Sequence, residues 1–366
     1  MAPDSRPSKD AFDSSSKSFA VSDKYFRPFN PYLIAEIGVN HGGSMVEAKD
    51  MISSAAKAGA HAVKFQSYTA SKLAAPDYSP SYWDLKSEPT TSQFELFSRY
   101  DMFTLDHFRE LGDYAGSLGV DFLSTPFDLD IAEGLAEFVP AFKVASADLT
   151  NVPLVSGLLE FDLPMILSTG AASTQEILAA AELMKNYNPP AAFLHCVLNY
   201  PTQLKNANIL GIRRLQESLP DNFFVGYSDH VPPGLHGEMP ALQAAFLLGA
   251  VVIEKHFTND RTKVGNDHYH AADYDSLREF SDWIPEAREM MGEWEPDLFI
   301  QETARQNARR RIFTSREIGA GEQLSDENMI ALRANEGIEV SEWESVVGKP
   351  ANQRIPAGKP IRWSNF

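Results

Sequence analysis

The sequence predicts an α/β fold, a (β/α)8 TIM barrel followed by a small β-rich domain. From Tyr32 onward, short apolar runs alternate with longer helix-like segments, a pattern typical of parallel sheets built from βα units. Eight such runs occur before the chain changes character near Gly292. Eight units over roughly 250 residues favour a closed barrel over an open doubly wound sheet. Beyond Gly292, a polar segment leads into short β-like pieces separated by GAGE and PAGK turns.

Each unit of the barrel has its own strand and helix signals. The runs expected to form the strands are YLIAEIG, AVKFQ, DFLSTP, FKVAS, PMILST, AAFLHCV, FFVGYS and VVIEKHF. One intervening helix is expected to begin at Ser44, with Glu47 three residues on, and to stop at Gly59. Another begins at Ser173, with Glu176 in the same relation. Both pairs have the spacing of a capping box, which satisfies the free amides of a first helical turn.

A long irregular connection, from Ser67 to about Tyr100, follows the second strand. It is rich in Pro, Ser, Tyr and Trp. Long loops in compact domains are commonly functional, so we interpret this one as an active-site lid. A structureless insertion is the alternative, and the sequence leaves it open.

Four segments are expected along the chain. Residues 1–28 are rich in Ser, Asp, Lys and Pro without an apolar stretch, which predicts a disordered tail rather than a signal peptide. The barrel then covers 29–292, a polar linker 293–307 and a compact domain 308–366. A domain of about 60 residues is marginal by itself, so we expect it to dock on a barrel.

Composition narrows the partners and the compartment. With a net charge of −18, the chain is not expected to bind nucleic acid or an anionic membrane surface. No apolar run approaches the ~20 residues of a membrane span. The one cysteine, Cys196, excludes an internal disulfide framework and favours a reducing, cytoplasmic location.

Two histidines indicate a metal site. His230 and His256 each close a short apolar run, so both are expected to leave the ends of neighbouring strands. Neutral imidazoles suit a divalent transition metal. Because two protein ligands leave most of the coordination sphere open, we expect a catalytic rather than a structural ion. For either histidine alone, a hydrogen-bonded core residue is the alternative, and the matched placement favours the metal.

Polar side chains also gather at the carboxyl ends of all eight expected strands. They are Glu36, Lys64, Gln66, Ser124, Thr125, Lys143, Ser146, Asp148, Ser168, Thr169, His195, Tyr200, Ser228, His230, Glu254 and His256. In a barrel these ends converge on the face where barrel enzymes place their sites. The two lysines and the hydroxyls can donate to an anion such as phosphate. Any one of these residues alone has a structural hydrogen bond as its alternative role.

With these motifs in place, the chain resembles the sialic acid synthases and, more broadly, the nonulosonic acid synthase family. The resemblance runs from about Pro31 to the C-terminus. It rests on AEIGVNHGG, KFQ, STPFD, KVASAD, LSTG, HCV with NYPT, GYSDH, EKHFT and a GND segment. Single fragments such as LSTG are weak, but nine in order on consecutive strands are specific. The C-terminal part resembles the antifreeze-like (SAF) domain of the same enzymes.

The resemblance implies a reaction and a set of binding residues. These enzymes condense phosphoenolpyruvate with an open-chain, N-acetylmannosamine-type sugar, releasing phosphate by C–O cleavage and forming a nine-carbon 2-keto acid. By motif, His230 and His256 match the ligands of a divalent metal, with Mn²⁺ expected first and Mg²⁺ or Co²⁺ as alternatives. The positions that match phosphoenolpyruvate contacts are Lys64, Thr125, Lys143, Ser146, Ser168 and Ser228. The positions that match sugar contacts are Gln66, Tyr200 and Asp267.

The resemblance also implies a domain-swapped homodimer and a set of catalytic groups. Arg333, in ALRANEGI, matches an arginine that the SAF domain delivers to the partner subunit's site. We expect Asp148, which stands where some members have Glu, to act as acid/base, with Glu36 as a further catalytic residue. Glu254 is expected to orient a metal-bound water, with an ion pair to Lys255 as the alternative.

Two departures from the family pattern affect the sugar site. Leu198 stands where some members have Asn, so that contact is not carried over. The rings of residues 268–270 after Asp267 put the identity of the sugar in doubt.

Three other functions stay open at this point. One is a phosphoenolpyruvate condensation with a phosphorylated aldose. Another is a Schiff-base aldolase that uses Lys64 or Lys143 as its amine. A noncatalytic sugar-binding barrel is the third, although a binder does not need two metal-type histidines beside an anion cluster.

Overall fold

The computed structural model describes residues 17–292 and 295–366 of the chain. The chain divides into two compact units, Met1–Gly292 and Glu293–Phe366. No helix within the described ranges is both long enough and apolar enough to cross a membrane.

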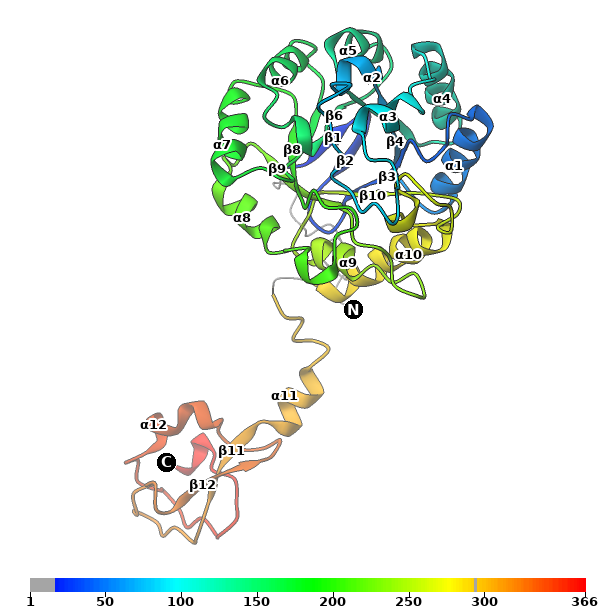
Figure 1. The fold of residues 1–366 in the computed structure, drawn as a ribbon. Helices are drawn as coiled ribbons and strands as arrows, with labels where there is room; N and C mark the ends of the chain where they lie inside the picture. The colour runs from blue at the N-terminus through cyan, green and yellow to red at the C-terminus, as the bar shows by residue number, and fades with distance from the viewer. Residues whose placement is uncertain (1–16, 293–294) are drawn as a thin grey trace. The chain divides into compact units, whose positions relative to one another are not determined.

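The first unit contains a closed, fully parallel barrel with the strand order β10-β3-β4-β5-β6-β7-β8-β9 (Figure 1). Its strands are β3 (Tyr32–Gly38), β4 (Ala62–Ser67), β5 (Asp121–Pro126), β6 (Phe142–Val144), β7 (Met165–Ser168), β8 (Ala191–Cys196), β9 (Phe224–Asp229) and β10 (Val252–His256). All eight fall on the runs expected from the sequence, so the predicted barrel is confirmed. Parallel barrel strands are covered on both faces, which explains why these runs are apolar almost throughout.

A ring of helices surrounds the strands (Figure 1). The helices that cover the barrel are α1 (Met45–Lys57), α4 (Leu105–Ser117), α5 (Leu129–Leu135), α6 (Val152–Leu159), α7 (Thr174–Leu183), α8 (Gly211–Ser218), α9 (Pro240–Leu247) and α10 (Tyr274–Met291). Short 3-10 turns lie at η1 (Ser146–Asp148), η2 (Leu204–Asn206) and η3 (His268–His270). The expected caps are present: the Ser44 hydroxyl accepts from the Glu47 amide, and Ser173 and Glu176 form a reciprocal capping box.

Alternation along each strand decides which side chains reach the barrel interior. In β3, Leu33 and Ala35 pack outward in the core shared with the helices, whereas Ile34 belongs to a second cluster inside the barrel. Glu36, two residues beyond Ile34, therefore also faces inward. The interior is thus apolar toward the amino ends of the strands and polar at their carboxyl ends.

The expected disordered tail is wrong for its last third. Residues 19–26 form an antiparallel hairpin, β1 (Phe19–Val21) with β2 (Lys24–Phe26). Phe19 is fully buried and packs with Ile34 in the cluster inside the barrel. The hairpin therefore closes the amino end of the barrel. The rest of the expected tail, up to residue 16, lies outside the described residues.

The connection from Ser67 to Tyr100 is not structureless. It contains α2 (Ala70–Leu73) and α3 (Gln93–Ser98). An isolated bridge between Pro80 and Ser92 holds its middle together. It is an ordered insertion after β4.

The second unit has a core of its own. Strands β11 (Arg310–Thr314) and β12 (Met329–Arg333) pair antiparallel, and the remaining elements are η4 (Val340–Glu342), α12 (Trp343–Val346) and η5 (Trp363–Asn365). The core consists of Ile312, Ile318, Leu324, Met329, Ile338, Val346, Ala351, Ile355 and Ile361. The expected linker, 293–307, is partly helical, because α11 (Glu302–Ala308) begins in it and ends one residue beyond it. Residues 293–294 lie outside the described residues.

Candidate active site

A cavity opens at the carboxyl ends of the barrel strands. Predicted site residues that line it are Glu36, Lys64, Gln66, Thr125, Lys143, Ser146, Ser168, Tyr200, Ser228, His230, Glu254, His256 and Asp267. They come from all eight strands or from the loops directly after them. Among the described residues of the first unit, Asp148 is the one predicted catalytic, metal-binding or substrate-binding residue that does not line the cavity.

Glu254 ties together the residues predicted to bind an anion. Its Oε2 lies 3.8 Å from Lys64 Nζ, and its Oε1 lies 3.6 Å from Lys143 Nζ. The Ser228 hydroxyl donates to Oε1 at 2.9 Å. Burial alone would raise the pKa of Glu254, but the two lysines hold that pKa below its ordinary value. Glu254 is therefore ionised, and its negative charge stabilises two buried ammonium groups.

The lysines also reach hydroxyl groups in the cavity wall. Lys143 Nζ donates to Ser168 Oγ at 2.8 Å, and Lys64 Nζ donates to Thr125 Oγ1 at 3.2 Å. Burial lowers the pKa of Lys143. Two cations and two hydroxyls in one wall form a donor set that suits phosphate or carboxylate oxygens.

Glu36 differs from Glu254 in its ionisation. Lys64 Nζ lies 2.5 Å from its Oε2, and Gln66 Nε2 donates to its Oε1 at 2.9 Å. Burial nevertheless raises the pKa of Glu36, against the opposing effect of Lys64. Two cavity carboxylates thus have pKa values pushed in opposite directions, an arrangement typical of catalytic acid/base sites.

The alternative ion pair between Glu254 and Lys255 does not form. Lys255 is fully buried on the outer side of β10, where its Nζ lies 2.7 Å from Asp229 Oδ2. Adjacent strand residues point to opposite faces, so Glu254 enters the cavity and Lys255 does not.

The histidines have the environment that metal ligands need. His230 Nδ1 donates to the Val197 carbonyl at 2.8 Å, which leaves the lone pair on Nε2. The rings of His230 and His256 are 5.2 Å apart between centroids. Burial holds the pKa of His256 well below its ordinary value, which keeps the ring neutral, as coordination requires. For His230, burial alone would lower the pKa, but Cys196 and the Val197 carbonyl raise it, so a metal would displace a proton from that ring on binding. The residues present therefore fit the divalent metal expected from the sequence.

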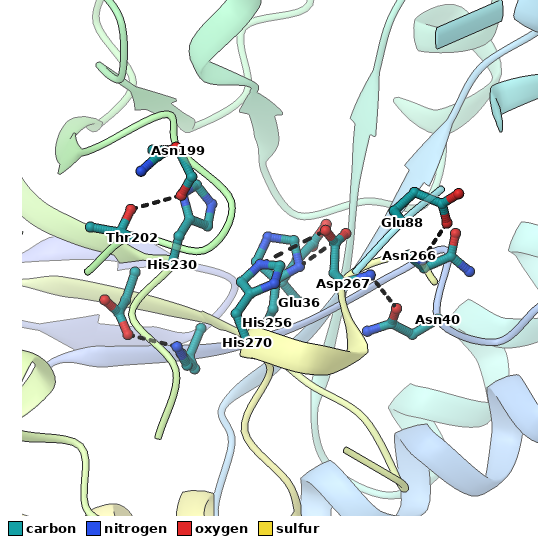
Figure 2. A network of polar contacts seen from close by, with 12 residues as sticks. Glu36, Asn40, Glu88, Asn199, Thr202, His230, His256, Asn266, Asp267 and His270 are labelled. Atoms are coloured by element: carbon teal, nitrogen blue, oxygen red, sulfur yellow. Dashed lines mark hydrogen bonds and ion pairs between the residues drawn. The ribbon is translucent and has the colours of Figure 1, made fainter. Parts of the chain in front are cut away.

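Two further groups lie beside His256. One ligand atom each from His256, Asp267 and His270 lies within 4.8 Å of the others. Figure 2 shows the His256 and His270 rings next to each other, both facing the Asp267 carboxylate. Burial raises the pKa of Asp267 to about 7. The rings after Asp267 are visible in the sequence, but no motif there indicates a role for His270.

The insertion after β4 supplies one side of the cavity. Its lining residues are Tyr82, Trp83, Glu88, Leu96, Phe97 and Tyr100. Glu88 accepts from the backbone amide of Asn266 at 3.0 Å, which joins the insertion to the loop that carries Asp267 (Figure 2). The sequence predicts that this segment is a lid but not which of its residues face the cavity, because an irregular loop has no periodicity that shows where its side chains point.

Some polar strand-end residues do not converge on the cavity. Ser124 Oγ contacts Ser67 Oγ at 2.6 Å, and His195 Nε2 contacts the Ala207 carbonyl at 3.0 Å, both outside the barrel interior. Asp148 accepts from Asn151 Nδ2 at 3.0 Å. Arg333 ends β12 of the second unit, with an exposed side chain.

With this geometry in place, the comparisons with known proteins identify the family. The NeuB family model matches residues 51–296, and the SAF domain model matches residues 309–366. The chain belongs to the NeuB family. The resemblance inferred from the motifs, including the C-terminal SAF domain, is thereby confirmed.

Relatives and solved structures agree along most of the chain. An N,N'-diacetyllegionaminic acid synthase from Legionella pneumophila is 33% identical over 345 residues, 92% of this chain and 94% of the relative. A pseudaminic acid synthase from Campylobacter jejuni is 30% identical, covering 92% of this chain and 96% of the relative. The crystal structure of an N-acetylneuraminic acid synthetase from Leptospira borgpetersenii superimposes with a TM-score of 0.70 at 31% identity, covering 80% of this chain and 97% of that one. The chain is thus a member of a family of nonulosonic acid synthases.

Proposed function

We propose that this protein condenses phosphoenolpyruvate with an open-chain, N-acetylmannosamine-type sugar to form a nonulosonic acid and inorganic phosphate. The observation that carries the proposal is that two groups of side chains line one cavity. One is the lysine wall, formed by Lys64, Lys143, Thr125 and Ser168, and the other is the histidine pair His230 and His256. Around the barrel, His256 pairs with Glu36, and Glu36 pairs with Lys64. The two halves of the site are therefore immediate neighbours.

The lysine wall suits the anionic substrate. Lys64 and Lys143 would offset the charge of the phosphate and carboxylate groups, while the hydroxyls of Ser168 and Thr125 fix their orientation. Glu254 keeps both ammonium groups charged and in place in a buried setting. This wall explains how a chain with a net charge of −18 can hold an anion.

The histidine side suits the aldehyde. A divalent metal held by His230 and His256 would supply Lewis-acid polarisation of the aldehyde oxygen. Gln66, Tyr200 and Asp267 line the same cavity and would orient the hydroxyl and acylamino groups of the sugar. The carbon–carbon bond forms when C3 of phosphoenolpyruvate attacks the aldehyde carbon, which leaves an electron-poor C2.

Glu36 is the acid/base that the geometry favours. Because burial raises its pKa, it can hold the proton that the former aldehyde oxygen takes up. The resulting carboxylate can then accept a proton from the water that adds to C2. Loss of phosphate from that tetrahedral carbon by C–O cleavage completes the reaction. Asp148, the acid/base expected from the sequence, does not line the cavity.

Phosphate release tests the proposal. Purified protein with Mn²⁺, phosphoenolpyruvate and a panel of acylated mannosamine-type aldoses should release phosphate with one aldose far faster than without it. Mass spectrometry should then find a product equal to the aldose plus pyruvate. Lys143→Met should lose activity, whereas Lys49→Met, in an exposed pair with Glu110, should keep it.

Two controls separate the alternatives. Borohydride treatment with substrate should trap no protein adduct, since a Schiff-base aldolase would be labelled on Lys64 or Lys143. Chelation should abolish activity, and Mn²⁺, Co²⁺ or Mg²⁺ should restore it. Phosphate release from no aldose in the panel, phosphorylated aldoses included, would count against the condensation.

A further inference from the structure

His270 is buried in the site without a structural role that explains it. It lies in the short turn η3 after Asp267 and has 0% of its surface exposed. Within the described residues, neither of its ring nitrogens has a hydrogen-bond partner. Buried polar atoms without partners are rare, because each costs the free energy of its lost hydration.

Two other buried histidines of this chain do have hydrogen-bond partners on their rings. His268, in the same turn, has its Nδ1 2.7 Å from the Thr258 hydroxyl. His195 has its Nε2 3.0 Å from the Ala207 carbonyl. These two are satisfied core histidines, whereas neither ring nitrogen of His270 has a partner, so the one lone pair of its neutral ring is available to a metal.

The surroundings of His270 indicate what that partner is. Its ring centroid lies 4.8 Å from that of His256 and 5.7 Å from that of His230. Its Nε2 lies 3.8 Å from Asp267 Oδ1. Unpaired imidazole nitrogens and a carboxylate oxygen facing one point form a donor set for a metal ion.

We propose that His270 is a third imidazole ligand of the metal, acting with His230, His256 and the Asp267 carboxylate. The proposal rests on the metal requirement of the proposed function and adds to it a ligand that the pair of strand-end histidines does not include. Metal–nitrogen bonds of about 2.0–2.1 Å require the donor atoms to draw closer than the 4.8 Å over which three of them are now spread. Side-chain rotations on the loop after β10 can supply that movement.

The added ligand has two consequences. Three imidazoles shift the preference of the site toward Co²⁺, Fe²⁺ or Zn²⁺ and away from Mg²⁺, which favours oxygen ligands and waters. Among the described residues, His270 is not part of the cavity lining. It would therefore occupy a coordination position that substrate does not reach, and the positions toward the cavity stay open.

Metal binding measured without turnover tests the proposal. Chelated protein, verified as metal-free, is titrated with Co²⁺ by calorimetry and by visible absorption. His270→Gln should weaken Co²⁺ binding by at least about 10–100-fold, the range seen when mere supporting residues of a metal site are lost. Its absorption bands should also change. His268→Gln, a buried histidine of the same turn, should keep wild-type affinity and spectrum.

A second measurement on the wild-type protein covers the case in which the variant does not fold. Pulsed electron paramagnetic resonance of the Cu²⁺-loaded protein should detect three coordinated imidazoles. Two imidazoles, or equal Co²⁺ affinity in folded His270→Gln and wild type, would overturn the proposal. So would a wild-type protein that binds no Co²⁺. Binding by an enzyme that releases no phosphate would instead contradict the proposed function and leave the ligand assignment intact.

Discussion

At the scale of single residues, the two glutamates of the cavity show that different surroundings shift the pKa values of identical carboxyl groups in opposite directions. Glu254 faces two lysines and a hydroxyl, and its pKa is held low. Glu36 contacts one lysine and one amide, and burial raises its pKa. The first suits a fixed charge and the second a proton carrier. Burial also raises the pKa of Asp148, whose carboxylate accepts from Asn151, but Asp148 does not line the cavity.

Glu36→Gln should therefore lower turnover by about 10²–10⁴-fold, the usual contribution of general acid/base catalysis. The expectation from sequence was that Asp148→Asn would show this loss, and the geometry now predicts a much smaller effect there. Both variants should bind phosphoenolpyruvate, as calorimetry can measure. A full loss of turnover in Asp148→Asn with normal activity in Glu36→Gln would return the role to Asp148.

The strand pattern predicts which strand ends carry polar residues but not which of two neighbours faces inward, and only the family resemblance selects Thr125 over Ser124. Thr125 enters the cavity, while Ser124 contacts Ser67 outside it. The alternation has a period of two, and its phase depends on how the strands close into a barrel. His195 was misplaced for the same reason. The sequence could not single out His270, because what distinguishes it is that neither of its ring nitrogens has a hydrogen-bond partner, and only the structure shows this.

At the scale of elements, the N-terminal hairpin is the clearest difference from expectation. Its strands are three residues long and lie in a polar segment, so no periodicity reveals them. What stabilises the hairpin is tertiary, because Phe19, Val21 and Phe26 pack inside the barrel. Tyr32 Oη and Lys24 Nζ both donate to Asp121, which anchors the hairpin at the strand ends.

Phe19→Ala should destabilise the protein by about 3–5 kcal/mol, the usual cost of deleting a buried phenyl ring. Tyr25→Ala, on the same hairpin but with 68% of its surface exposed, should change stability by less than about 0.5 kcal/mol. Urea unfolding of both variants measures the difference. Equal stability of the two variants would mean that the hairpin does not close the barrel in solution.

The insertion after β4 is joined to the loop that carries Asp267 through Glu88, whose ionisation makes this contact sensitive to pH. Burial alone would raise the pKa of Glu88, but the Thr90 hydroxyl and the amides of Asn266 and Thr90 donate to it and hold that pKa below its ordinary value. A lowered folded-state pKa means that this stabilisation is complete above the ordinary value and is lost as the pH falls through the folded value. Arg99, which donates to Thr90 Oγ1 at 2.8 Å, supports the charged form.

Protection of the Asn266 amide from hydrogen exchange should therefore fall, by more than intrinsic chemistry explains, as the pH drops below the ordinary glutamate pKa of about 4.3. Glu88→Gln keeps an acceptor but cannot ionise, so its protection should not follow this trend. Comparing wild type and variant at each pH cancels the intrinsic rate. Parallel behaviour of the two would show that Glu88 does not control the attachment.

At the scale of the whole molecule, the barrel is the part that the sequence predicts best. Parallel strands buried on both faces leave apolar runs that can be counted in a sequence, which is why all eight were found. The second unit has its own apolar core and ends β12 with Arg333. Within the part of the chain that the structure describes, no ion pair or side-chain hydrogen bond is recorded for this exposed guanidinium.

An arginine that stays charged and can donate two parallel hydrogen bonds suits delivery to a sugar or carboxylate. We expect the second unit to deliver Arg333 to the barrel of a partner subunit in a homodimer. Chains with Arg333→Ala and chains with His256→Ala should each be inactive as homodimers. In a mixed dimer completed in trans, one site carries both lesions and the other carries none.

Equal mixing with subunit exchange should then restore about a quarter of wild-type activity, because half of the dimers are mixed and each has one intact site. Native mass spectrometry of the two chains, distinguished by isotope labelling, measures how many mixed dimers form.

A mixture of His256→Ala with His230→Ala chains is the matched control. Those two lesions belong to the same barrel whichever subunit supplies the arginine, so both sites of that mixed dimer stay damaged and no activity should return. Recovery only in the first mixture would establish that the arginine crosses between subunits. Abundant mixed dimers without recovery would mean that Arg333 serves its own barrel or none.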